Sequence, residues 1–158
     1  MSIEQKLKAP FKKVHWRISR KTKDGKKAAV LAYLNARDVR HRLDEVVGMS
    51  NWQVRFPRDG YCEIGIRESI LHEVGDADCL PDYDRWLWKG DGAGVTAVEA
   101  EKGQYSDAFK RAAVTWGIGM YLYYLPDIWV PLKNEYGDFD APQLPKWAQY
   151  QEESSDEK

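Results

Sequence analysis

The 158-residue sequence has few of the residues on which most metal and redox sites depend. Its two cysteines, Cys62 and Cys79, have no metal-binding spacing, and its three histidines, His15, His41 and His72, are scattered. We therefore expect no metal site and no cofactor. Two cysteines without a secretory context are typical of a reducing compartment, and we expect both to be free thiols.

Long apolar runs are also absent. The least polar stretch, near residues 116–125, is shorter than the roughly 20 residues that span a bilayer. No apolar segment follows Met1, so the sequence predicts no secretory signal. We expect a cytoplasmic protein without membrane contact.

Motifs for nucleotide or nuclease chemistry are missing or incomplete. The Gly-rich segment at residues 90–94 lacks the lysine of a phosphate-binding loop, so ATP-driven strand exchange is not indicated. Pro81 and Asp82 could begin a nuclease motif, but the acid-x-Lys triplet that should follow occurs only at residues 156–158. We predict no catalytic residues and no enzyme, and a metal-dependent nuclease stays as the alternative.

Charge is present in an uneven distribution, although the whole chain has a net charge of only −1. Residues 1–42 hold 13 Lys and Arg against three acidic residues, a net +10, and the remainder has 11 basic and 22 acidic residues, a net −11. This pattern favours a polyanionic partner, or a basic face that meets the acidic face of a second copy. Chance clustering of solvated charges remains the third explanation.

Hydrophobic periodicity predicts two hairpins and a helix in the first half of the chain. Residues 14–34 alternate as a strand pair that turns at Asp24-Gly25, and residues 51–74 form a second hairpin that turns at Asp59-Gly60. Between them, a helix begins after Asn35 and stops at Gly48. Asp38, three residues after Asn35, completes its N-terminal cap.

A strand near residues 85–89 precedes a second helix, which begins between residues 96 and 106. The stretch from residue 105 to residue 125 is typical of a buried helix, yet it contains the adjacent cations Lys110 and Arg111. One stripe is apolar, with Tyr105, Phe109 and Trp116, and another carries Lys102, Ser106 and Lys110. The cations either contact phosphates or form a solvated face that pairs with Asp107. Most tryptophans are expected in the core or at an interface, and Trp86 and Trp88 are the best candidates for exposed rings.

We divide the chain into a basic arm (residues 1–13), one folded domain (14–141) and a flexible acidic tail (142–158). The tail contains Pro142 and Pro145, and few apolar side chains follow residue 148. Such a segment gains little from burial.

Two segments resemble the Rad52/Rad22 family of single-strand annealing proteins. Residues 33–52, YLNARDVRHRLDEVVGMSNW, are similar to the first family signature, in which Gly48 and Trp52 fit. Residues 101–123 resemble the second, in which an Asp-small-apolar-Lys-Arg-Ala run leads to an aromatic-Gly pair. The overall pattern is closest to the short, phage-borne Sak-like members. Asp38 departs from the family, whose eukaryotic members have a DNA-contacting arginine at that position.

The resemblance implies an α+β fold: an antiparallel β-sheet of β-β-β-α type, packed on a long helix and assembled into an oligomeric ring. It implies ATP-independent binding of single-stranded DNA and annealing of complementary strands in recombination and repair by a phage-encoded protein. The expected partners are single-stranded DNA and about ten copies of the chain, together with a single-strand-binding protein or nuclease. A protein that assembles without binding DNA is the other alternative. The expected DNA contacts are Arg37, Arg40, Lys102, Lys110 and Arg111.

Overall fold

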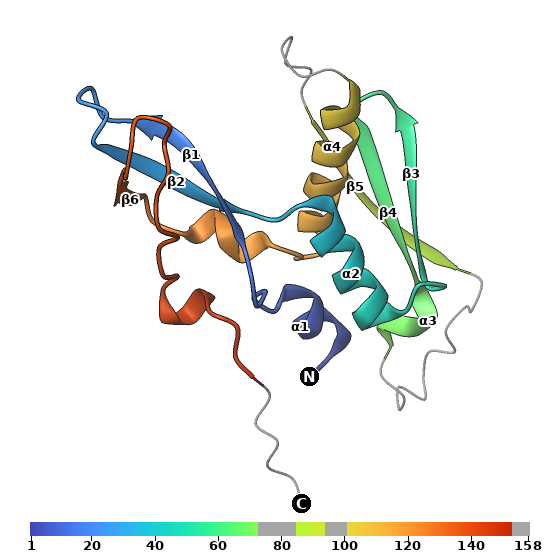
Figure 1. Ribbon diagram of the computed structural model, residues 1–158. Coiled ribbons are helices and arrows are strands. Elements are labelled where there is room, and N and C mark those ends of the chain that lie inside the picture. Colours follow the sequence, from blue (N-terminus) through green and yellow to red (C-terminus); the bar gives the residue numbers. More distant parts are fainter. Residues whose placement is uncertain (73–84, 94–100, 153–158) are drawn as a thin grey trace, which may run out of the picture. The chain divides into compact units, whose positions relative to one another are not determined.

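A computed structural model describes residues 1–72, 85–93 and 101–152, with backbone only at residues 101 and 102 (Figure 1). The chain forms two compact units: residues 1–9 with 34–120, and residues 10–33 with the chain from residue 121 onward. Each unit has its own three-stranded antiparallel sheet. The predicted α+β class and antiparallel pairing are confirmed. The single sheet that we expected is wrong, because the two hairpins belong to separate sheets.

The first unit contains the sheet β3-β4-β5 and two main helices. Its strands are β3 (Trp52–Arg58), β4 (Tyr61–Arg67) and β5 (Trp86–Gly92), and its helices are α2 (Ala36–Val47) and α4 (Glu101–Thr115). Both helices lie on the same side of β3 and β4 in Figure 1. The second predicted hairpin, the strand after it and the capped helix are thereby confirmed.

Alternation along β4 determines which face of this sheet is buried. Cys62, Ile64 and Ile66 have no exposed surface, and α4 packs on β4 and β5. From α4, Phe109 is fully buried, and the indole Nε1 of Trp116 donates to the carbonyl of Ile64 at 3.0 Å. The opposite face of the sheet carries the polar and aromatic residues of the same strands.

Helix α2 begins at the cap that the sequence predicts. Asn35 accepts from the backbone N–H of Asp38, and the Asp38 carboxylate accepts from the backbone N–H of Asn35, both at 2.9 Å. This reciprocal pair is a capping box. Asp38 therefore has a structural role in this chain. The family resemblance implies a DNA-contacting arginine at this position in eukaryotic members.

The predicted basic arm contains a short helix, α1 (Ile3–Lys8), with its own capping box between Ser2 and Gln5. Leu7 is buried, and the buried Arg42 of α2 donates to the carbonyls of Lys6, Leu7 and Ala9. These contacts attach α1 to α2. A sequence window of mostly charged residues did not indicate this helix, because one leucine and one distant arginine supply its packing. A further short helix, α3 (Glu68–Leu71), follows β4.

Helix α4 ends at Thr115, earlier than the predicted helix through residue 125. Gly117 has φ +87°, its N–H donates to the Val114 carbonyl, and the N–H of Ile118 donates to the Ala113 carbonyl. This is a Schellman motif, which stops an α-helix at a left-handed glycine. The chain continues into a 3₁₀ helix, η1 (Met120–Tyr124).

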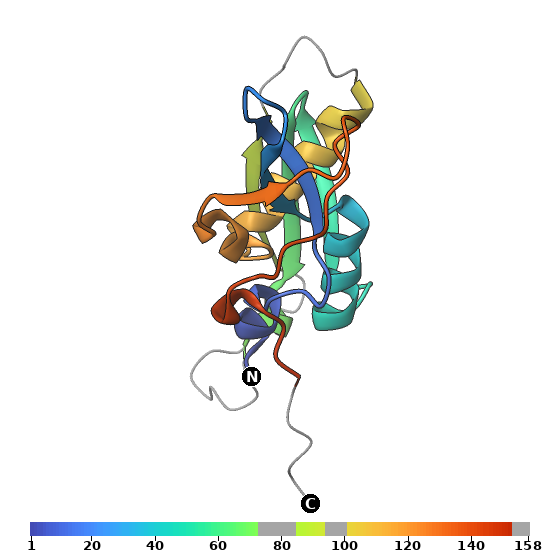
Figure 2. The ribbon, with the colours of Figure 1, turned by 60° about the vertical axis from the view of Figure 1, so that its left-hand side comes forward.

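The second unit contains the sheet β1-β2-β6. Strands β1 (His15–Lys21) and β2 (Lys27–Tyr33) form the predicted hairpin, and β6 (Ile128–Pro131), which the sequence did not indicate, pairs with β2. The turn uses Gly25 at φ +70°. After β6 the chain runs back along β1 (Figure 2).

The first part of the predicted acidic tail is packed within this unit. A 3₁₀ turn, η2 (Lys146–Ala148), places Ala148 out of contact with solvent, and Lys12 stacks on the ring of Tyr150 at 4.8 Å. An open groove of about 660 Å³ lies between residues 11–16 and residues 142–152. Residues 153–158 lie outside the described part of the chain.

Candidate nucleic-acid interface

Arg37 and Arg40 lie in the first turns of α2 and are both exposed. The guanidinium of Arg40 lies 4.7 Å from the ring centroid of Phe109 on α4 and 5.9 Å from that of Trp52 on β3. Arg40 is therefore held beside the β3 edge of the sheet, with its charge stacked on aromatic faces. It keeps its donors available to an anion.

Lys102, Lys110 and Arg111 belong to α4. Lys110 lies 3.8 Å from the Asp107 carboxylate, as the solvated-face interpretation expects. Arg111 lies 3.3 Å from the carboxylate of Asp91 on β5. The side chain of Lys102 is outside the described part of the structure. Consecutive helical residues point about 100° apart, so Lys110 and Arg111 point in different directions.

The structure therefore does not gather the predicted residues into one compact patch. Arg40 lies at the β3 edge of the sheet and Arg111 at the β5 edge, with the central strand β4 between them.

A further group of residues lies on the sheet face that is turned away from α4. We define the outer sheet face by the outward positions of three strands: Gln53, Arg55 and Arg58 of β3, Tyr61, Glu63, Gly65 and Arg67 of β4, and Trp86, Trp88, Gly90 and Gly92 of β5. Three arginines lie over three aromatic rings: Arg55 on Trp88 at 3.7 Å, Arg58 on Tyr61 at 4.5 Å and Arg67 on Trp86 at 4.9 Å.

Sequence reasoning singled out the two tryptophans as candidates for exposed rings, whereas both are only half-exposed because arginines lie over them. It missed the three arginines. The signal was present, because Arg55, Glu63 and Arg67 occupy the polar positions of two alternating strands. The arginine–tryptophan stacks could not be predicted without the strand register. The register places Trp86 opposite Arg67 and Trp88 opposite Gly65.

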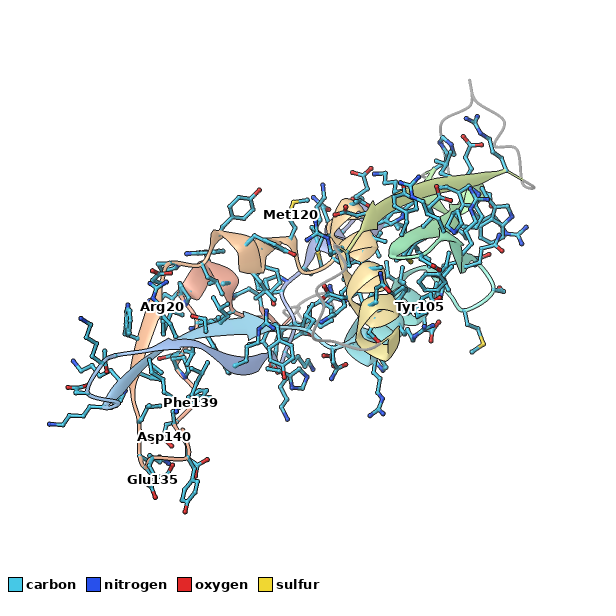
Figure 3. All side chains as sticks on the ribbon, turned by 90° about the horizontal axis from the view of Figure 1, so that it is seen from above. Arg20, Tyr105, Met120, Glu135, Phe139 and Asp140 are labelled. Atoms are coloured by element: carbon cyan, nitrogen blue, oxygen red, sulfur yellow. The ribbon has the colours of Figure 1, made fainter. Side chains whose placement is uncertain are left out.

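The second unit carries another stack of this kind at β6. Arg20 of β1, labelled in Figure 3, pairs with Asp127 at 2.8 Å. Its guanidinium lies 5.2 Å from the ring of Trp129, which is exposed. Arg17 lies over Tyr33 at 5.9 Å. The basic residues of the first hairpin are thus partly paired with groups of their own unit.

The catalytic alternatives gain no support from the described residues. Pro81 and Asp82 lie outside them. Within residues 1–72, 85–93 and 101–152, no three His, Cys, Asp or Glu side chains are grouped as a metal site. No helix in those ranges has both the length and the apolar character to cross a bilayer.

The buried thiol of Cys62 is also unsuited to chemistry. It lies on the inner face of β4 without exposure to solvent, and burial raises its pKa to about 11. A thiol with a raised pKa is protonated near neutral pH and is a poor nucleophile or metal ligand.

Comparison with known proteins identifies the class. The family model described as "Rad52/22 family double-strand break repair protein" matches residues 84–140, which include β5, α4 and β6. Two relatives extend the similarity to nearly the whole chain, so the chain belongs to this family. The family resemblance found in the two sequence signatures is confirmed.

Both relatives are named single-stranded DNA-binding protein DdrA. The protein of Deinococcus deserti is 32% identical over 97% of this chain and 73% of its own length. That of Deinococcus radiodurans is 30% identical over 92% of this chain and 67% of its own length. No solved structure matches the chain significantly.

Proposed function

We propose that this protein binds single-stranded DNA and anneals complementary strands during the repair or recombination of DNA. The observation that carries the proposal is the 32% identity, over 97% of the chain, to a protein named for single-stranded DNA binding. Family membership adds the context of double-strand break repair.

The mechanism is electrostatic and needs no ATP. Arg37 and Arg40 at the α2 end, and Lys102, Lys110 and Arg111 on α4, contact phosphates. Such contacts do not depend on base sequence, which suits a protein that must pair any two complementary strands. The weak ion pairs of Lys110 and Arg111, with distances of 3.8 and 3.3 Å, are replaced by phosphate contacts at little cost because all four groups are partly exposed.

The test compares variants of the two predicted clusters with a matched control. Arg37→Ala/Arg40→Ala and Lys110→Ala/Arg111→Ala should each weaken binding to every oligonucleotide sequence and lower the salt slope by roughly 0.7 per lost phosphate contact. Lys133→Ala/Lys146→Ala removes two cations from the C-terminal segment and should change neither quantity. Folded variants with unchanged affinity and slope would show that these residues are not the contacts.

Annealing itself is measured with two complementary labelled oligonucleotides, without nucleotide and with EDTA. We expect annealing under these conditions. Cleavage that appears only with Mg²⁺ would favour the nuclease alternative, and the absence of any DNA binding at low salt would favour an assembly protein.

The proposal includes a closed ring of about ten subunits. A head-to-tail contact either closes into a ring or continues as a filament. Light scattering and electron microscopy test this part separately, since a monomer that anneals DNA would remove the ring but keep the activity.

A further inference from the structure

The outer sheet face has the composition of a surface that meets a flexible polyanion. Three of its residues are arginines and one is acidic, a net charge of +2. Three aromatic rings lie between these charges, and none of the outward positions defined above carries an aliphatic side chain. Figure 1 shows α2 and α4 together on the other side of β3 and β4.

Glycines allow the aromatic side chains to lie flat on this face. A Cβ on Gly65 would lie 2.9–3.0 Å from three ring atoms of Trp88, so the indole rests on the backbone of β4. A Cβ on Gly90 would lie 2.7 Å from Glu63 Cγ and 2.9 Å from the Tyr61 hydroxyl. The side chains of Trp88, Glu63 and Tyr61 thus occupy the space that a side chain at Gly65 or Gly90 would need.

The central stack has three layers. Trp88 lies on Gly65, Arg55 lies 3.7 Å from the Trp88 centroid, and the Nε of Arg55 donates to the Glu63 carboxylate at 2.5 Å. The side chain of Arg55 is nevertheless 52% exposed, whereas that of Glu63 is 21% exposed. The ion pair with Glu63 therefore fixes the orientation of the Arg55 guanidinium, and the other side of this planar cation faces solvent.

A flat guanidinium backed by an indole is suited to one ligand class. Unpaired bases stack on aromatic rings and on arginine planes, and the remaining guanidinium donors reach phosphates. The other two stacks lie at the two ends of β4, at Tyr61 and Arg67, about 20 Å apart at the usual rise per residue. The three stacks form a row along which an extended strand can lie.

We propose that the outer sheet face is a base-stacking site for single-stranded DNA, distinct from the phosphate contacts of α2 and α4. This inference rests on the proposed function. It adds that the outer sheet face contacts the bases of the DNA, whereas α2 and α4 contact its phosphates. The Arg55 guanidinium, supported from below by Trp88, stacks on a base, Trp86 stacks on a second base, and Arg58 and Arg67 contact phosphates. A second copy of the chain that meets this face with its own outer sheet face is the less suitable occupant, because two surfaces that each carry a net charge of +2 repel one another.

The experiment compares oligothymidine with an abasic oligonucleotide of equal length, which keeps the phosphates and lacks the bases. The wild-type full chain should bind oligothymidine more tightly. Trp86→Leu/Trp88→Leu should lose roughly 5- to 100-fold in affinity for oligothymidine and keep its affinity for the abasic strand. Trp86→Tyr/Trp88→Tyr retains the rings and should keep most of the preference, and Trp147→Leu, which removes an exposed indole from η2, should keep all of it.

Arg55→Lys is the second variant. It keeps the positive charge, removes the planar guanidinium and leaves the core unchanged. It should reduce the preference for oligothymidine and leave the salt slope unchanged, because the charge stays. Arg58→Gln/Arg67→Gln should instead weaken both oligonucleotides and flatten the slope.

The outcomes separate the two proposals. If the wild-type protein binds neither oligonucleotide, the proposed function fails. If it binds and the folded Trp86/Trp88 and Arg55 variants keep the full preference for bases, this inference is overturned and the function stands. If these variants change the subunit number in solution and keep the preference, the face is a contact between copies, and the inference is also overturned. Should the double tryptophan variant fail to fold, the Arg55→Lys result decides.

Discussion

Arg42 shows how one side chain joins two elements that are distant in sequence. Its Nη1 donates to the carbonyls of Lys6, Leu7 and Ala9 at 3.1, 3.2 and 2.7 Å. The carbonyls of Lys6 and Leu7 belong to the end of α1, where a helix leaves acceptors unpaired and where a cation is favourable. Arg42 therefore acts as a capping group supplied by α2.

Replacing Arg42 with Met should lower the free energy of unfolding by about 2–4 kcal/mol, because it removes the hydrogen bonds to the buried Leu7 carbonyl and the partly buried carbonyls of Lys6 and Ala9. Chemical denaturation measures this change. Arg37→Met removes an exposed arginine from the same helix and should change stability by less than about 0.5 kcal/mol. Equal effects of the two substitutions would show that the contacts to α1 contribute nothing.

The buried thiol of Cys62 predicts how the stability of the protein depends on pH. Burial raises its pKa to about 11 from the usual value of 9.0. Below pH 9 the thiol is protonated in both states, so this contribution to stability is fully present. Between pH 9 and pH 11 the unfolded chain releases the proton and the native chain retains it, so stability falls by about 2–3 kcal/mol over that range.

The measurement uses unfolding at a series of pH values in a Cys79→Ser background, with Cys62→Ala as the reference. The difference between the two curves isolates the thiol from the lysines and tyrosines that titrate in the same range. In the same background, thiol-reactive dyes should label the native protein at pH 8 only as fast as it unfolds. Rapid labelling of the folded protein would contradict the burial of Cys62.

At the scale of elements, two glycines with left-handed φ have unequal surroundings. A Cβ on Gly117 would lie 2.5 Å from Cγ of Lys8, whereas a Cβ on Gly25, at the tip of the first hairpin, would meet nothing within 4 Å. Both positions disfavour alanine, but only Gly117 adds a steric clash with α1.

We expect Gly117→Ala to cost about 2–4 kcal/mol and Gly25→Ala about 1 kcal/mol. Thermal or denaturant unfolding of the two variants checks the order. A Gly25 variant as unstable as the Gly117 variant would mean that backbone strain alone, and not the approach of Lys8, explains the role of Gly117.

Local chemistry made most elements predictable from the sequence. Asp24-Gly25 and Asp59-Gly60 identify their turns, and Asn35 with Asp38 identifies the start of α2. Strand β6 was missed because it has four residues, ends in proline and is stabilised by pairing with β2 about 100 residues away. The end of α4 was missed because apolar residues continue beyond Gly117, and hydrophobic periodicity alone does not show that the helix stops before this glycine.

The candidate contacts could be predicted only in part, for the same reason. Motif and charge indicated cations on α2 and α4, but their separation across the sheet depends on tertiary packing. The stacks on the outer sheet face depend on strand register. Trp88 could be recognised as an unusual residue, whereas its position between Gly65 and Arg55 could not.

At the scale of the whole molecule, the charge asymmetry of the sequence is largely balanced inside one unit. Residues 10–33 have a net charge of +7 and residues 121–158 a net charge of −5, and both segments belong to the second unit. Arg20 with Asp127 is one of the resulting pairs. The contrast between +10 and −11 along the chain is therefore a weaker argument for head-to-tail assembly than the sequence alone suggested. The proposed ring rests on the family relationship.

The same packing changes what truncation of the acidic tail should do. We expected residues 142–158 to form a flexible tail, yet Ala148 is fully buried and the side chain of Gln149 donates to the Leu144 carbonyl at 2.7 Å. A chain that ends at residue 152 keeps these contacts and loses only charged and polar residues. It should unfold at the same temperature as the full chain and anneal DNA at least as fast, because an anionic competitor for the cationic surface has been removed.

A chain that ends at Ala141 should behave differently. It loses the residues that line one side of the groove beside β1, so Trp16 and neighbouring side chains become more exposed, and the ring of Tyr150 no longer covers Lys12. The lost burial should lower the unfolding temperature by several degrees. Thermal unfolding and annealing rates of both truncations check this, with chain 1–152 as the control for the loss of negative charge. If chain 1–141 is as stable as the full chain and anneals as well, the boundary of the annealing domain at residue 141 stands, and the packed segment contributes nothing to the fold.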